Sequence, residues 1–141
     1  MTQPRPFNGQ DINVAAAATR AILDMLLAEA GLTFHQFVAL RAMPGERTAV
    51  AERAAGPGAD TAALGRAIDE LAAAGLAHGT PIEPTTRGRE LLERITAASV
   101  RTGDQLFDGI PIEDQVIVKR VLDLVTERAK VLRSELAGQA W

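Results

Sequence analysis

The feature that most constrains this chain is a helical spacing of apolar residues, which recurs along most of the sequence between short breaks. Apolar positions three or four residues apart are typical of amphipathic helices that bury one face. Glycine and proline supply the breaks, at Gly31, Pro44-Gly45, Gly56-Pro57-Gly58, Gly75 and Gly109-Ile110-Pro111. With 141 residues, the sequence predicts a mainly α fold of six helices in a single domain, residues 1–141.

Local signals place the ends of these helices. Helices are expected over 11–30, from Thr33 to the Pro44 break, over 47–55, from Asp60 to Gly75, from Thr85 or Thr86 to about Thr102, and over 113–137. Thr33 followed three residues later by Gln36 has the pattern of a capping box. Asp60 is a candidate N-cap, and Gly75 has the position of a C′ glycine. The segment 76–84 has room for one small hairpin.

The helices at the two ends are apolar over more than one face. In the last helix, one apolar stripe consists of Val118, Val121, Leu122, Val125, Leu132 and Leu136, and a second of Ile117, Leu124 and Val131. A helix with this pattern is buried on more than one side. The short region between Thr33 and Leu76 is too small to cover both end helices. We therefore expect residues 11–30 and 111–137 to form the dimerisation unit of a two-fold homodimer.

Composition excludes several classes of function. The chain has no cysteine, which excludes disulfides and thiolate sites, and its two histidines are too few to hold a zinc ion. No residues form a recognisable catalytic set, so we expect neither an enzyme nor a metal or other cofactor. The first ten residues lack the apolar core of a secretion signal, and no stretch has the roughly 20 apolar residues of a membrane span. A cytoplasmic location without membrane contact is expected.

Three segments resemble the MarR family of bacterial transcription regulators. Residues 32–40, LTFHQFVAL, are similar to the second helix of that family. Residues 60–76, which end in LAAAGL, resemble its recognition helix and the entry to its wing, and residues 84–92, PTTRGRELL, resemble the segment that leaves the wing. The resemblance covers nearly the whole chain. It implies a winged helix-turn-helix region over 33–92 and a homodimer that binds a palindromic operator in double-stranded DNA.

The resemblance also implies positions for the two sites. For DNA, Thr61 and Arg66 are expected to contact bases or phosphates, and Arg87 and Arg89 to contact phosphates. Family members are often tuned by small aromatic or acidic ligands. The matching pocket residues are Met25, Phe34, Phe37 and Arg41, with Arg41 as the partner for a carboxylate. The alternative for the three apolar residues is a place in the core.

Two departures from the family favour a second hypothesis. The wing segment 77–84 has no arginine, where the family carries one that enters the minor groove. Residues 33–92 hold six arginines and seven acidic residues, a net charge of −1, where a DNA-binding surface is usually basic. The alternative is a degenerate winged-helix protein that acts as a protein-interaction or ligand-binding module without specific DNA binding.

Overall fold

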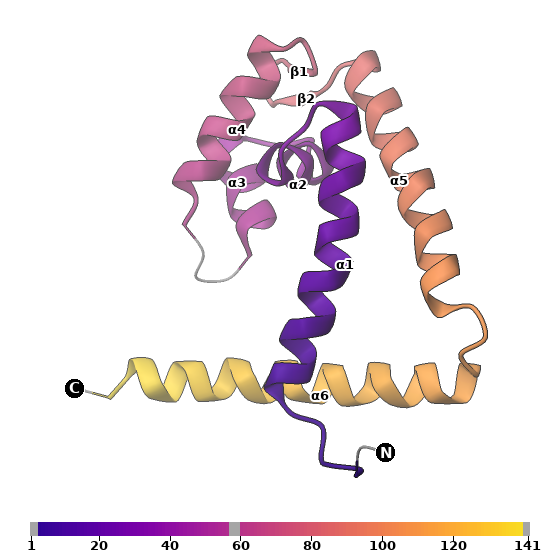
Figure 1. The fold of residues 1–141 in the computed structure, drawn as a ribbon. Helices are drawn as coiled ribbons and strands as arrows, with labels where there is room; N and C mark the ends of the chain where they lie inside the picture. Colours follow the sequence, from indigo (N-terminus) through magenta and orange to yellow (C-terminus); the bar gives the residue numbers. More distant parts are fainter. Residues whose placement is uncertain (1–2, 57–59, 140–141) are drawn as a thin grey trace. The chain divides into compact units, whose positions relative to one another are not determined.

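A computed structural model describes residues 3–56 and 60–139 of the chain (Figure 1). The elements of this described part are, in order, α1 (Gly9–Ala30), α2 (Phe34–Ala42), α3 (Arg47–Ala55), α4 (Ala62–Ala73), β1 (Ala77–His78), β2 (Glu83–Pro84), α5 (Thr86–Phe107) and α6 (Ile112–Ala137). The predicted mainly α fold of six helices and one small hairpin is confirmed. Of the predicted break at 56–58, Pro57 and Gly58 lie outside the described residues. No helix of the described part is long and apolar enough to cross a membrane.

The contacts divide the chain into two compact units, one up to Thr102 and the other from Gly103 onward. The boundary falls within α5, which runs five residues beyond the predicted end at Thr102. The first unit contains the helix-turn-helix elements and the hairpin, and therefore both predicted sites.

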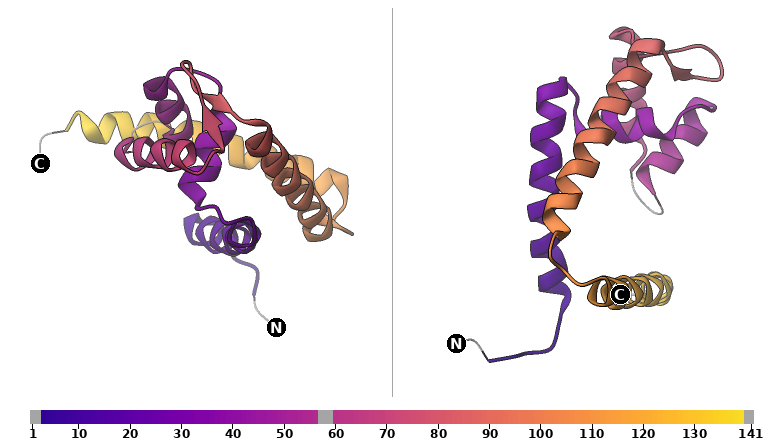
Figure 2. Two further views of the ribbon diagram at one scale, coloured as in Figure 1. Left: turned by 90° about the horizontal axis from the view of Figure 1, so that it is seen from above. Right: turned by 90° about the vertical axis from the view of Figure 1, so that its right-hand side faces the viewer.

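The core of the first unit lies among α2, α3, α4 and the hairpin. The four buried residues of α4 have the predicted helical spacing, whereas the four of α2 are the consecutive residues 37–40. The largest fully buried side chains are Leu27, Leu40, Val50, Ile68, Leu71 and Ile82. Helix α1 contributes only Leu27 to the buried set, so most of its apolar surface is not covered by this unit. In the right-hand view of Figure 2 the hairpin projects on the side away from α1.

The helix starts show how local sequence fixes the elements. Thr33 and Gln36 form the predicted capping box, in which each side chain accepts the backbone N–H of the other residue at 3.1 Å. The start of α4 differs from the prediction, because Thr61 and not Asp60 is the N-cap. Asp60 still serves this end of the helix, since its carboxylate accepts the N–H of Ala62 at 2.9 Å. The cap lies one residue later, where the helical backbone begins.

The junction between the hairpin and α5 explains the threonine–x–x–glycine segment. The Thr85 hydroxyl donates to the carbonyl of Gly75 at 2.8 Å and accepts the N–H of Gly88 at 3.1 Å. The Thr85 N–H donates to the carbonyl of Leu76 at 3.0 Å. Gly88 lies so close to the segment between α4 and β1 that a Cβ atom would stand 2.1 Å from the Leu76 oxygen. The first turn of α5 is therefore fastened to the end of α4.

Helix α1 begins two residues before the predicted start, at a second capping box. The Asn8 side chain accepts the N–H of Asp11 at 3.2 Å, and the Asp11 carboxylate accepts the N–H of Asn8 at 3.0 Å. The same carboxylate accepts two hydrogen bonds from the guanidinium of Arg5, at 2.6 and 2.9 Å. The Arg5 and Asn8 hydrogen bonds lower the pKa of Asp11 from 3.8 to about 2.

This shift predicts a pH dependence at the start of α1. Because the pKa of Asp11 is lower in the folded chain, its contribution to stability is present above pH 3.8 and is lost as the pH falls through about 2. A carbon NMR titration of the Asp11 carboxyl group is expected to give a midpoint near pH 2. In Arg5→Ala the midpoint is expected to move back toward 3.8. A wild-type midpoint near 3.8 would contradict the ion pair.

Candidate functional site

The exposed face of α4 is the first part of the predicted DNA site. It lies opposite the buried Leu64, Ile68 and Leu71, and it carries Arg66 and, at its N-cap, Thr61. The Thr61 side chain makes no capping hydrogen bond. Arg66 is exposed and makes no ion pair or hydrogen bond with any described residue. Both groups are free to donate to a ligand at this face.

Two other arginines near this face are held by the protein itself. Arg47 forms an ion pair with Asp69 of α4, which neutralises one of the two acids on the exposed face of that helix. Arg53 of α3 donates through one nitrogen to the carbonyls of Ala42 and Pro44, at 2.6 and 2.9 Å. These carbonyls follow the end of α2, so Arg53 fastens α3 to the α2–α3 turn.

The two predicted phosphate contacts on α5 also have backbone partners. Arg89 donates to the carbonyl of Pro84, at the end of β2, at 2.9 Å. Arg87 lies 3.4 Å from the carbonyl of Ala74, at the end of α4, which is a long and weak hydrogen bond. Each guanidinium has five N–H donors, so further contacts remain available to both. Arg66 is nevertheless the only predicted cation of the DNA site without a partner in the described part of the chain.

The wing is a short hairpin without a free cation. His78 and Glu83 are paired across its two strands, with 3.6 Å between Nε2 of His78 and Oε1 of Glu83. Beside this hairpin, Ile82 exchanges two backbone hydrogen bonds with Gly45 of the α2–α3 turn, at 2.9 and 3.1 Å. The wing is therefore joined to the same turn that Arg53 holds. Its described side chains offer no arginine to a minor groove.

The second site is a pocket of about 590 Å³ between α1, α2 and α5, here named the Arg41 pocket. Its lining residues are Ala16, Thr19, Arg20, Leu23, Phe37, Arg41, Thr96, Ser99 and Val100. The Arg41 guanidinium lies 5.0 Å from the centre of the Phe37 ring and makes no hydrogen bond with any described residue. The pocket thus presents an aromatic ring beside a cation whose N–H donors are free.

Two of the four predicted ligand residues lie in this pocket and two do not. Phe37 and Arg41 are brought together because they are four residues apart on one face of α2. Met25 is 71% exposed on α1 and lies outside the lining. Phe34, at the start of α2, is covered by the Arg20 guanidinium at 3.3 Å from its ring centre. Phe34 therefore packs against α1 and does not line the pocket.

Sequence reasoning missed the polar residues of α1 and α5 in this pocket. Ser99 is the most informative of them, because its hydroxyl oxygen is buried and has no hydrogen-bond partner in the described part of the chain. The signal was present in the sequence. Ser99 follows the buried Ile95 by four residues, so a polar side chain continues the buried stripe of α5.

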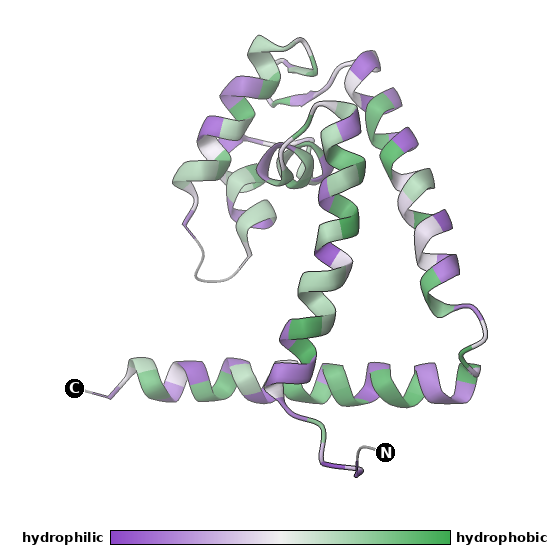
Figure 3. Cartoon of the chain, viewed as in Figure 1, coloured by the Kyte–Doolittle hydropathy of each residue, from purple (hydrophilic) through white to green (hydrophobic). Residues whose placement is uncertain are grey.

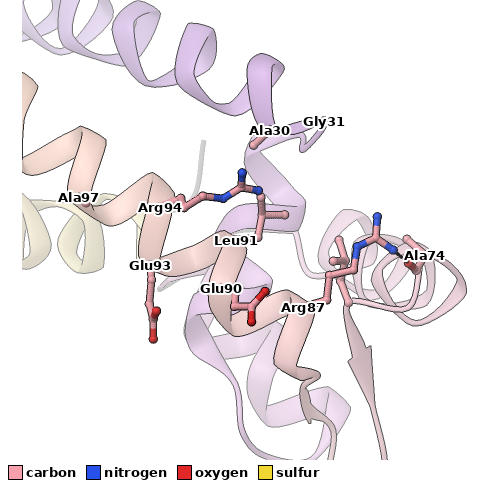
Figure 4. A pocket seen from close by; sticks show the side chains of 10 residues that line it. Ala30, Gly31, Ala74, Arg87, Glu90, Leu91, Glu93, Arg94 and Ala97 are labelled. Atoms are coloured by element: carbon pink, nitrogen blue, oxygen red, sulfur yellow. Dashed lines mark hydrogen bonds between the residues drawn. The ribbon is translucent and has the colours of Figure 1, made fainter.

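A second pocket, of about 870 Å³, lies beside Arg87 (Figure 4). In the figure, Arg87 points toward Ala74 and Arg94 toward the end of α1. Glu90 and Glu93 line the pocket as well, so the lining holds two cations and two acids. This balance of charge gives the pocket no preference for an anion.

The helices at the two ends of the chain, α1 and α6, each expose apolar side chains. No residue of α6 is buried, and its exposed apolar side chains include Ile117, Val118, Leu124, Val131 and Leu132. Figure 3 shows that α1 is largely hydrophobic and that hydrophobic residues alternate with hydrophilic ones along α6. Within the second unit, the residues of both predicted stripes are exposed, apart from the half-buried Val121.

Comparison with known proteins identifies the fold. No protein-family model matches the sequence, and no curated protein matches it. Among solved structures, the MarR family protein Rv2887 of Mycobacterium tuberculosis in complex with salicylic acid is 26% identical, with a TM-score of 0.64 over 86% of this chain and 99% of that one. The same protein in complex with DNA gives 23% identity and a TM-score of 0.69, over 86% and 98% of the two chains.

A third solved structure agrees with these two. It is the structure of BpsR from Bordetella bronchiseptica, a protein whose DNA binding is regulated by 6-hydroxynicotinic acid. It is 23% identical, with a TM-score of 0.66 over 86% of this chain and 99% of that one. The arrangement of the helices and the hairpin therefore corresponds to one known architecture. This chain has the winged-helix fold of the MarR family regulators.

Proposed function

We propose that this protein is a dimeric, DNA-binding transcription regulator whose affinity for DNA is tuned by a small aromatic or acidic ligand. The observation that carries the proposal is the free, exposed pair of Thr61 and Arg66 on α4, in a fold that Rv2887 presents in complex with DNA. The second helix of a helix-turn-helix enters the major groove with its N-terminal residues toward the bases. Thr61 is the N-cap of α4 and Arg66 lies in its first half, where such contacts occur.

The other proposed DNA contacts are Arg87 and Arg89, at the start of α5. Their backbone partners at Ala74 and Pro84 hold the two side chains at the junction of recognition helix, wing and α5. A guanidinium held in this way keeps free donors for a phosphate and loses less side-chain entropy on binding. We assign both to phosphate positioning, with no part in reading the sequence.

The ligand part of the proposal rests on the Arg41 pocket. A carboxylate placed at the free Arg41 guanidinium would have an aromatic or apolar body beside Phe37 and Leu23. The complex of Rv2887 with salicylic acid supports a ligand of this class. A ligand shifts DNA binding only by its difference in affinity between the DNA-competent and incompetent states. The walls of the Arg41 pocket include α1 and also α2 of the helix-turn-helix. A shift of α2 relative to α1 between the DNA-competent and incompetent states would therefore change the pocket.

The dimer follows from the uncovered apolar surface of the end helices. Exposed apolar side chains that cluster on two helices are typical of subunit interfaces. A second copy of the chain carries the same apolar surface, so pairing of the two copies buries the surface of each. Dimerisation would present two α4 helices to the half-sites of a palindromic operator.

The alternative function is a ligand-binding or protein-interaction module without specific DNA binding. The observation that favours it is the wing, which offers a paired His78 and Glu83 where a minor-groove arginine is expected. The ion pair of Arg47 with Asp69 also leaves little free positive charge beside α4.

The experiment that separates the two functions is a DNA titration of the purified protein at two salt concentrations. One arm uses the DNA that flanks its own gene, and the other uses random duplex of equal length. Tight, salt-sensitive binding to a flanking fragment is expected, with a footprint over two half-sites about one helical turn apart. Weak and equal binding to both duplexes would favour the alternative function.

Arg66 is expected to carry the largest single contribution to DNA binding. Arg66→Ala should weaken operator binding by about 1–3 kcal/mol if the guanidinium reads a base, with a much smaller loss on random DNA. Fluorescence anisotropy on both duplexes measures the two losses. Equal losses would assign Arg66 to a phosphate, and no loss on either would contradict its place in the interface.

A further inference from the structure

The wing carries one pair of titratable side chains and no other ionisable residue. In residues 77–84 these are His78 and Glu83. They face each other across the two strands, with 3.6 Å between Nε2 of His78 and Oε1 of Glu83, and each side chain is more than half exposed. The formal charge of the wing is therefore −1 while the imidazole is neutral, and it becomes zero when the imidazole is protonated.

The wing is fixed beside the proposed DNA face of α4. Strand β1 packs against α4, and Ile82 exchanges two backbone hydrogen bonds with Gly45 of the α2–α3 turn. When α4 lies in the major groove, a hairpin held beside it is expected to face the neighbouring phosphates. An uncompensated carboxylate at this position repels phosphates, whereas an imidazolium offers them a charged N–H donor.

The side chains around the wing leave the pair to itself. The charged residues of the elements beside the hairpin are Glu46, Arg47, Glu52 and Arg53 of α3 and its N-cap, Arg66, Asp69 and Glu70 of α4, and Arg87, Arg89 and Glu90 at the start of α5. In the described part of the chain, none of their side chains forms an ion pair or hydrogen bond with His78 or Glu83. The charge of the wing therefore depends on these two residues alone.

We propose that the His78–Glu83 pair makes DNA binding sensitive to pH, with the protonated wing as the form that binds DNA more tightly. The inference rests on the proposed DNA-binding function. Histidine is the side chain that ordinarily changes charge between pH 5 and 8. In the protonated ring, Nε2 donates to Glu83 and Nδ1 carries a second N–H for a phosphate oxygen. In the neutral ring, Glu83 keeps its negative charge uncompensated, and binding depends on α4 and α5.

The test compares DNA affinity at about pH 5.5 and about pH 8, at one ionic strength, by fluorescence anisotropy. The duplexes are the DNA that flanks the protein's own gene and random DNA of equal length. The wild type is expected to bind both about three- to tenfold more tightly at the lower pH, because each wing of the dimer gains one exposed charge contact. In His78→Gln this ratio should fall to near one.

Two further variants complete the design. Glu83→Gln removes the carboxylate, so it should bind DNA more tightly than the wild type at about pH 8. His35→Gln is the matched control, since His35 is the only other histidine of the chain and is exposed on α2. It should keep the wild-type ratio.

Proton uptake gives an independent readout of the same group. Because DNA binding and protonation of His78 favour each other, complex formation at about pH 6.5 should take up protons in the wild type and not in His78→Gln. Calorimetry in two buffers of different ionisation enthalpy measures this uptake. A wild-type ratio near one, or a ratio that persists in His78→Gln, would overturn the inference and leave the proposed function intact. Absence of DNA binding at both pH values would contradict the proposed function itself, and the inference with it.

Discussion

Gly88→Ala is expected to lower the free energy of unfolding by about 3 kcal/mol, because its added Cβ would make the closest contact of any described glycine. The added Cβ would stand 2.1 Å from the backbone oxygen of Leu76 and 3.4 Å from Cβ of Pro84. Neither neighbour is the end of a flexible side chain. The Leu76 oxygen also accepts the Thr85 N–H, so it moves only if the wing junction opens.

The matched control is a glycine in the middle of another helix. A Cβ on Gly65 of α4 would meet nothing within 4 Å, so Gly65→Ala should raise stability by about 0.5–1 kcal/mol. Urea unfolding followed by circular dichroism measures both variants. A loss at Gly88 no larger than the change at Gly65 would contradict the close packing of α5 on Leu76.

The elements most easily predicted from sequence are those with a signal at both ends. Helix α3 has its predicted bounds, Arg47–Ala55, because breaks flank it on both sides. Helix α5 was predicted too short because Gly103 follows the expected end. A glycine inside a helix costs only about 1 kcal/mol, so Gly103 does not end α5, which continues to Phe107.

Contacts of the candidate sites could be predicted from the sequence where both residues lie close together in one helix, and not where the partners are distant in the sequence. Phe37 and Arg41 meet because one helix places them on one face. The sequence could not predict which arginines near α4 have partners within the protein. The acceptors of Arg53 and Arg87 are backbone carbonyls 9 to 13 residues away in the sequence. Every residue has such a carbonyl, and only the fold decides which of them an arginine reaches.

Arg53→Ala is expected to weaken DNA binding although its guanidinium faces the protein. The substitution removes the donor from the carbonyls of Ala42 and Pro44, and it should lower stability by about 1–3 kcal/mol. The α2–α3 turn then loses its tie to α3, and Ile82 of the wing is bonded to that turn through Gly45. Amide exchange of Gly45 and Ile82 should speed up in the DNA-free variant, since their mutual hydrogen bonds loosen.

The dependence of DNA binding on salt separates this positioning role from a phosphate contact. A side chain that neutralises a phosphate releases counterions, so its removal reduces the slope of log K against log salt by about one. The slope should fall in this way in Arg87→Ala and Arg89→Ala, and it should stay at the wild-type value in Arg53→Ala. Arg53→Lys, which keeps the charge and one donor nitrogen, should recover part of the affinity. A slope reduced by about one in Arg53→Ala would place Arg53 on the DNA, and its bonds to the turn would then be secondary.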